Sequence, residues 1–153
     1  MLRDLTGRLR EQAAEVGSTI DLVLPEAIVG MWDRGRIEQV LTNLLSNAIK
    51  YGMGKPIRVG ADTTEARVRL WVEDGGMGIA AVDQQRIFLA FERLASAQRV
   101  GGLGLGLYIG QQIADAHGGA LLVESQVGRG SRFTLELPRA APVPAPAAGL
   151  RAP

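Results

Sequence analysis

The chain of 153 residues contains no cysteine, which excludes disulfide bonds, thiolate metal sites and cysteine nucleophiles and is consistent with a reducing compartment, here expected to be the cytoplasm. Aromatic residues make up only 5%, too few for a surface that stacks nucleic-acid bases. The net charge is only +1, and no apolar run approaches the roughly 20 residues that span a bilayer. We therefore expect no nucleic-acid partner and no direct membrane contact.

The remaining composition is that of an ordinary globular domain with one hydrophobic core. Hydrophobic residues make up 46% and charged residues 22%. The last segment, residues 140–153, is rich in proline and alanine and predicts a tail or linker. We expect an N-terminal helix over residues 1–17, a core domain over residues 18–139 and this tail.

Hydrophobic periodicity predicts an α+β fold. Helical spacing is found in four segments: Leu2–Val16, Asp33 to about Tyr51, Val82–Phe91 and Gly104–Ala116. Alternation predicts strands at Ile20–Leu24, Ala27–Trp32, Ile57–Ala61, Ala66–Glu73, Ala120–Ser125 and Ser131–Leu137. Since helices and strands do not alternate regularly, we predict a mixed sheet of about five strands, covered by helices on one face.

The long helix from Asp33 carries a polar stripe opposite its apolar side. At ~100° per residue, Gln39, Asn43, Asn47 and Lys50 fall on one narrow stripe. Amide oxygens suit Mg²⁺, which keeps waters and phosphates as its other ligands, and a lysine one turn on can meet phosphate charge. The alternative is that the stripe is simply a solvated helix face. For this helix considered alone, that alternative is favoured.

Two glycine-rich segments add to this pattern. Residues Asp74–Ile79 follow a strand, and a carboxylate there can accept a hydrogen bond from an exocyclic amine such as that of adenine. The alternative is a tight turn capped by aspartate. Residues Gly101–Leu107 open a helix, where free N–H groups suit phosphate. This segment matches neither the dinucleotide fingerprint nor the P-loop, and it also fits a flexible lid hinge near Ala95–Gly102.

In order and spacing, these segments resemble the conserved boxes of sensor histidine kinases. Asn43–Tyr51 is similar to their asparagine box, Asp74–Ile79 to the first glycine box, Phe88–Arg93 to the phenylalanine box, and Gly102–Leu107 to the second glycine box. The resemblance covers roughly Asp33–Leu137. It implies the Bergerat fold of the GHKL superfamily, a two-layer α/β sandwich shared with gyrase and related chaperones.

The resemblance also implies ATP and Mg²⁺ as cofactors. It makes Asn47 the metal ligand and places Asn43 on the phosphate side. Lys50 and Arg93 would contact phosphate, and Asp74 would bind the adenine amino group. The further nucleotide-binding positions that it implies are Tyr51, Gly76, Gly78, Ile79, Phe91, Gly102, Leu103, Gly104, Leu105, Gly106 and Leu107.

The sequence departs from the family pattern at three positions. Gly75 stands where asparagine is frequent, Leu103 where threonine or serine is usual, and Tyr108 where the residue is usually small. These departures bear on nucleotide affinity and lid geometry. The single histidine, His117, precedes Gly118 at a helix end and lacks the flanks of a phosphoacceptor box, so we expect it to be a structural cap.

The resemblance implies a protein-histidine kinase that transfers the ATP γ-phosphate to a histidine on a separate dimerisation and phosphoacceptor domain, with a response regulator receiver domain downstream. The N-terminal helix would lead from that domain. A gyrase-type ATPase carries a glutamate base where this chain has Asn43, and an amide cannot take up a proton from water at neutral pH. An anti-sigma-factor-type serine kinase and a non-enzymatic nucleotide sensor remain alternatives.

Overall fold

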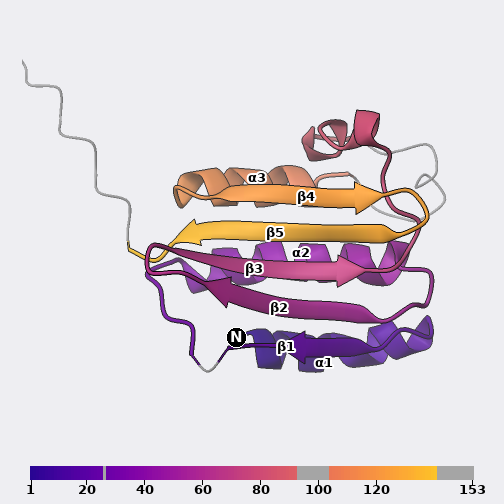
Figure 1. Ribbon diagram of the computed structural model, residues 1–153, viewed down its shortest axis with the longest axis horizontal. Coiled ribbons are helices and arrows are strands. Elements are labelled where there is room, and N and C mark those ends of the chain that lie inside the picture. The colour runs from indigo at the N-terminus through magenta and orange to yellow at the C-terminus, as the bar shows by residue number, and fades with distance from the viewer. Residues whose placement is uncertain (26, 93–103, 141–153) are drawn as a thin grey trace, which may run out of the picture.

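The computed structural model describes residues 1–25, 27–92 and 104–140. They form one five-stranded sheet with the strand order β1-β2-β3-β5-β4 (Figure 1). β1 runs parallel to β2, and every other pair is antiparallel. The predicted α+β class with a mixed sheet is confirmed. The strands are β1 Ile20–Val23, β2 Ile57–Thr63, β3 Arg67–Asp74, β4 Ala120–Gln126 and β5 Gly130–Pro138.

Three helices lie behind the sheet in Figure 1: α1 Leu2–Glu15, α2 Arg34–Tyr51 and α3 Gly106–Ala116. α2 begins where the sequence predicts a helix, directly after Asp33, whose side chain caps it by accepting a hydrogen bond from the Arg36 N–H at 3.1 Å. It ends at Gly52. No helix among the described residues is long and apolar enough to cross a membrane.

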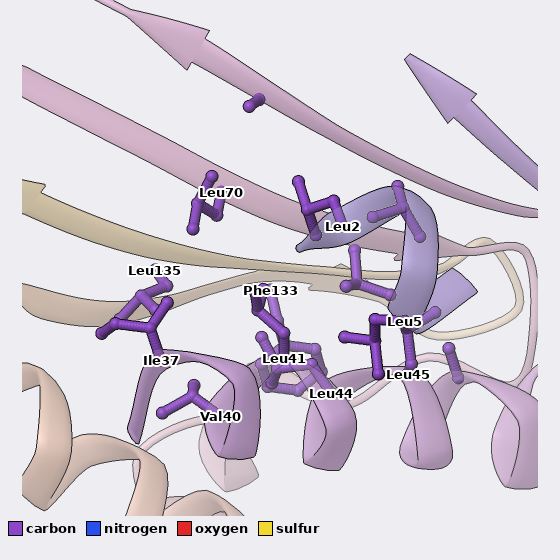
Figure 2. Close-up of a cluster of buried hydrophobic side chains, with 14 of the residues drawn as sticks. Leu2, Leu5, Ile37, Val40, Leu41, Leu44, Leu45, Leu70, Phe133 and Leu135 are labelled. Atoms are coloured by element: carbon purple, nitrogen blue, oxygen red, sulfur yellow. The ribbon is translucent and has the colours of Figure 1, made fainter. Parts of the chain in front are cut away.

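The core lies between this helical layer and the sheet (Figure 2). Every second residue of β3 and β5 points into it, as the period of a half-buried strand requires. α1 adds its own leucines to the same cluster, which joins the N-terminal helix to the rest of the core. The largest fully buried side chains of the core are Leu5, Ile37, Leu41, Leu44, Leu45, Ile57, Leu70, Leu135 and Leu137.

The opposite face of the sheet is polar, with one tryptophan at its centre. Trp71 is only 4% exposed because arginines cover its ring: the guanidinium carbons of Arg132 and Arg58 lie 4.1 and 5.7 Å from the ring centroid. Gly60 pairs with Trp71 across β2 and β3, and a Cβ there would lie 2.2 Å from the indole ring. The glycine thus makes room for the indole.

The predicted strand at Ala27–Trp32 is wrong. Its described residues alternate between exposed and half-buried, as a strand on a surface does, but they pair with no strand of the described chain. Their link to the sheet is end-on: the Met31 N–H donates to the Arg139 carbonyl at 3.2 Å, and Trp32 Nε1 donates to the Pro138 carbonyl at 2.7 Å. The segment is an extended connection that crosses the end of β5.

The predicted helix at Val82–Phe91 is also wrong. The segment contains two single 3₁₀ turns, η1 Ala81–Asp83 and η2 Arg86–Phe88. Its main-chain hydrogen bonds span three residues, for example from the Leu89 N–H to the Arg86 carbonyl at 3.0 Å. Phe91 has a φ of +62°, which no right-handed helix can include. The segment expected to be mobile, Ala95–Gly102, and most of the Pro/Ala-rich tail lie outside the described residues.

Candidate functional site

The polar stripe of α2 lies beside the start of α3. Asn43 and Asn47 are half-buried and Lys50 is exposed, while Leu44 on the other side of the helix is fully buried. Asn43 Nδ2 donates to the Gly106 carbonyl at 3.4 Å. This contact brings the amide stripe and the N-terminus of α3 together at one place.

Asp74 stands at the end of β3, next to the end of α2. A Cβ at Gly52 would lie 3.6 Å from the Asp74 Cβ. One carboxylate oxygen of Asp74 accepts a hydrogen bond from the Gly76 N–H at 2.9 Å. Burial raises the pKa of this carboxyl above its usual value, and the backbone N–H groups of Gly76 and Ser131 offset only part of that effect. A half-buried carboxylate with free acceptor capacity is therefore present at the predicted base-binding position.

The loop after Asp74 is packed too closely for side chains at two of its glycines. A Cβ at Gly76 would lie 2.0 Å from the Tyr51 carbonyl oxygen. At Gly78, φ is +70°, and a Cβ would lie 2.0 Å from the Gln126 carbonyl oxygen. Both glycines are thus required by backbone contacts, on one side with the end of α2 and on the other with the end of β4.

The phenylalanine segment divides into a buried and an exposed part. Phe88 packs edge-on against Phe133, with ring centroids 6.5 Å apart, so it anchors the segment to the core. Phe91 is 72% exposed, and its N–H donates to the Gly104 carbonyl at 3.1 Å. That bond joins the two ends of the described chain that flank residues 93–103.

The structure brings most of the predicted site residues to this end of the fold. Tyr51 ends α2, Ile79 packs on the core beyond the loop, and Leu107 packs on the core from the first turn of α3. Gly104 has a φ of +73°, and Leu105 occupies the N-cap position of α3. The predictions for Arg93, Gly102 and Leu103 lie outside the described residues.

His117 has the structural role expected from the sequence. Its Nδ1 lies 2.8 Å from the Ile113 carbonyl oxygen, and its Nε2 accepts a hydrogen bond from the Asp33 N–H at 3.2 Å. These two contacts require the neutral ring with the proton on Nδ1. The ring therefore connects the end of α3 to the start of α2.

Sequence reasoning missed three residues that hold the loop after Asp74. The Ile79 N–H donates to Ser125 Oγ at 2.8 Å, and Ser125 Oγ lies 2.7 Å from Ser131 Oγ. Gln84 Nε2 donates to the Ile79 carbonyl at 3.1 Å. The available signal was Ser125 itself, a polar residue at a strand position that faces the helical layer.

The described residues include no cluster of three or more histidine or acidic side chains that could hold a metal ion. A divalent cation at this site would thus take only part of its ligands from the protein. Asn47 offers a neutral amide oxygen, and Mg²⁺ commonly takes its remaining ligands from phosphates and water. The donor set therefore fits a metal that arrives with a nucleotide.

Residues 32–141 match the family described as histidine kinase-, DNA gyrase B- and HSP90-like ATPase. The chain is 36% identical over 135 residues to the sensor protein SrrB of Staphylococcus aureus, which covers 86% of this chain but 23% of SrrB. It resembles full-length ShkA solved with AMPPNP, with a TM-score of 0.82, 32% identity, and coverage of 92% of this chain and 29% of ShkA.

The catalytic domain of the histidine kinase ThkA is similar over most of both chains. The TM-score is 0.79 and the identity 28%, with 90% of this chain and 91% of the ThkA chain covered. The neighbour is a catalytic domain by itself, and the match extends over nearly its full length. The chain belongs to the histidine kinase-, DNA gyrase B- and HSP90-like ATPase family, and it is an ATP-binding catalytic domain of the sensor histidine kinase type.

Proposed function

We propose that this domain transfers the γ-phosphate of ATP to a histidine on a separate dimerisation and phosphoacceptor domain. The observation that carries the proposal is the contact between Asn43 and Gly106, because it places the amide stripe against the helix start expected to face phosphate. Asp74 closes the other side of the same end of the fold. SrrB is a sensor protein, and the proposal extends that role to this chain.

Asp74 would hold the adenine. Its carboxylate keeps acceptor capacity beyond the bond from Gly76, and an adenine amino group can use it. Guanine presents a carbonyl oxygen at that position, which a carboxylate repels. The closely packed glycines 76 and 78 keep side chains out of the loop that would border the base. Tyr51, half-buried at the end of α2, would pack nearby.

The phosphate side would be formed by α2 and the start of α3. Asn47 would be the protein ligand of Mg²⁺, which when bound screens the charge of the phosphates. Lys50 would contribute a further cation, as would Arg93. The task of these residues is to orient the γ-phosphate in line with an incoming imidazole nitrogen and to stabilise its charge.

The geometry of Asn43 argues against a water-activating ATPase. Its amide nitrogen donates to the Gly106 carbonyl and so serves as a packing contact between α2 and α3. An amide has no basic nitrogen that could take a proton from water. We therefore infer slow hydrolysis in the absence of an acceptor.

Incubation with radiolabelled ATP, with and without a histidine hairpin domain from a related kinase, tests the proposal. We expect a label on the hairpin that is acid-labile and base-stable, as a phosphoramidate is, and no label on this chain. Acid-stable labelling of a protein substrate would favour a serine kinase instead. Rapid phosphate release by this domain alone would favour a gyrase-type ATPase. Nucleotide binding without any transfer would favour a non-enzymatic nucleotide sensor. Transfer onward to a response regulator receiver domain is the further expected step.

A further inference from the structure

We propose that Ser125 and Gln84 are positioning residues that fix the loop from Gly75 to Ile79, and through it the adenine site. The inference rests on the proposed function, because it concerns the same nucleotide site. Neither residue belongs to the segments that resemble the kinase boxes, and both act through the backbone of Ile79.

Ser125 is placed to serve as the centre of this contact. It lies near the end of β4 and pairs with Ser131 of β5, on the face of the sheet that the helices cover. Its hydroxyl accepts a hydrogen bond from the Ile79 N–H at 2.8 Å and donates to the Gly130 carbonyl at 2.9 Å. The Ser131 hydroxyl, 2.7 Å away, then supplies the second donor to Ser125 Oγ. The hydroxyl thus uses its one proton and both lone pairs.

Gln84 holds the other backbone polar group of the same residue, Ile79. Its Nε2 donates to the Ile79 carbonyl at 3.1 Å and to the Ser125 carbonyl at 3.0 Å. The N–H and the C=O of Ile79 are therefore both tied to β4, one directly through Ser125 and one through Gln84. A neutral amide with two N–H groups suits this bridge, whereas a carboxylate would not.

The β4–β5 hairpin also reaches the start of the loop. The Gly128 N–H donates to the Met77 carbonyl at 2.9 Å, and Ser131 pairs with Asp74 in the β3–β5 ladder. Gly130 packs so closely that a Cβ would lie 1.9 Å from the Asp74 carbonyl oxygen. The end of the β4–β5 hairpin thus holds two parts of the adenine site. It fixes Asp74, whose carboxylate would bind the adenine amino group, and the backbone of the loop that follows Asp74.

Loss of the Ser125 hydroxyl should therefore loosen the loop without opening the phosphate side, which α2 and α3 form separately. For Ser125→Ala and Gln84→Leu we expect the Kd for ATP and ADP to rise about tenfold. A change of that size is what the loss of one well-placed hydrogen bond to the ligand typically causes. The Kd for GTP divided by the Kd for ATP should fall toward one, because the preference for adenine is weakened. The Kd for inorganic tripolyphosphate should not change. Ser125→Thr, which keeps the hydroxyl, should remain close to the wild type.

Thr42→Ala is the matched control, because it removes a part-buried hydroxyl that bonds to the Glu38 carbonyl within α2 and does not contact the loop. Calorimetry gives the three affinities, and amide hydrogen exchange of Ile79 without nucleotide gives a readout independent of binding. We expect faster exchange of Ile79 in both loop variants and not in the control. Unchanged exchange and unchanged ATP affinity would overturn the inference, as would equal losses for ATP and tripolyphosphate.

Three further outcomes separate this inference from the proposed function or from a role in folding. If the wild type binds no ATP, or binds ATP and GTP equally, the proposed adenine site fails whatever the variants show. If the wild type prefers ATP and the variants keep that preference, only the positioning role fails. If both loop variants lose their cooperative melt, the contacts serve folding rather than nucleotide selection, and the inference is overturned.

Discussion

At the scale of single residues, Asp74 shows a conflict between stability and binding. Burial raises the pKa of its carboxyl, so the folded domain holds the proton more tightly than the unfolded chain does. The stability that this group contributes is complete at pH values below the ordinary aspartate range and is lost as pH rises through the raised folded pKa. At neutral pH the ionised carboxylate consequently favours the fold less than the protonated carboxyl would.

Asp74→Asn should therefore raise the melting temperature at pH 7 and weaken ATP binding in the same protein. The amide can still accept from the Gly76 N–H but loses the charged acceptor for adenine, a loss of ~1.5–3 kcal/mol or about ten- to over a hundredfold in Kd. Calorimetry and thermal melts between pH 4 and pH 8 measure both. The gain in melting temperature should shrink as pH falls. Asp21→Asn, on an exposed carboxylate of β1, is the control, and a stable variant with wild-type ATP affinity would contradict the assignment.

Asn47→Ala should remove most of the gain in ATP affinity that Mg²⁺ gives, while the fold stays intact. Asn47 is half-buried on the polar stripe, away from the buried leucines of α2, so its truncation leaves no core cavity. ATP is titrated into the protein once with Mg²⁺ and once with EDTA, and the ratio of the two affinities gives the gain due to Mg²⁺. We expect this gain to fall about tenfold or more in the variant, ~1.4 kcal/mol. Gln39→Ala, an exposed amide on the same stripe, is the matched control. A lost cooperative melt would show that Asn47 is structural.

At the scale of elements, the sequence predicts what local patterns determine and misses what needs a distant partner. The helix from Asp33 and the strands at Ile57–Ala61, Ala66–Glu73, Ala120–Ser125 and Ser131–Leu137 follow from patterns of residues close in the chain, and all of them are confirmed. The alternation at Ala27–Trp32 predicted a strand, but alternation reports only which side is covered. A strand also needs a free edge to pair with, and this segment meets the sheet only at the end of β5.

The same limit applies to the site. The loop from Asp74 to Ile79 is visible in the sequence because its residues are consecutive. Ser125 lies 46 residues from Ile79, and no spacing rule connects them before the β4–β5 hairpin is placed beside β3. The strand order, with β5 between β3 and β4, is the information that the sequence pattern did not contain.

His117→Ala should weaken the junction between α2 and α3. The substitution removes the acceptor for the Asp33 N–H and the ring contact with the Ile113 carbonyl. We expect a loss of roughly 1–2 kcal/mol in the free energy of unfolding, the usual range for a lost helix-terminal contact. Urea denaturation at pH 8 measures it. Gln112→Ala, exposed on α3, serves as control, and an unchanged midpoint would show that the ring contacts contribute nothing to stability.

At the scale of the whole molecule, the packing of α1 bears on whether this helix belongs to the same folding unit as the sheet and α2. The sequence pattern predicted an N-terminal helix over residues 1–17 that leads into a core domain. In the structure, Leu2 and Leu5 lie in one buried cluster with α2 and the sheet (Figure 2). Leu9 belongs to the same cluster. The Arg8 guanidinium also pairs with Glu38 of α2. We propose that α1 and the ATP-binding core unfold as one unit.

Leu5→Ala tests this unity. Leu5 is 2% exposed, and truncating a buried leucine in a packed core costs roughly 2–5 kcal/mol through lost burial and the cavity left behind. If α1 belongs to the folding unit, the entire domain should lose that stability, in a single transition seen equally by far-UV circular dichroism and by the fluorescence of the two tryptophans, Trp32 and Trp71. Gln12→Ala, exposed on the same helix, should leave the transition unchanged. Two separate transitions, or a loss of helicity while the tryptophan fluorescence transition stays unchanged, would show instead that α1 is an appended helix and that the rest of the domain is stable without its leucines.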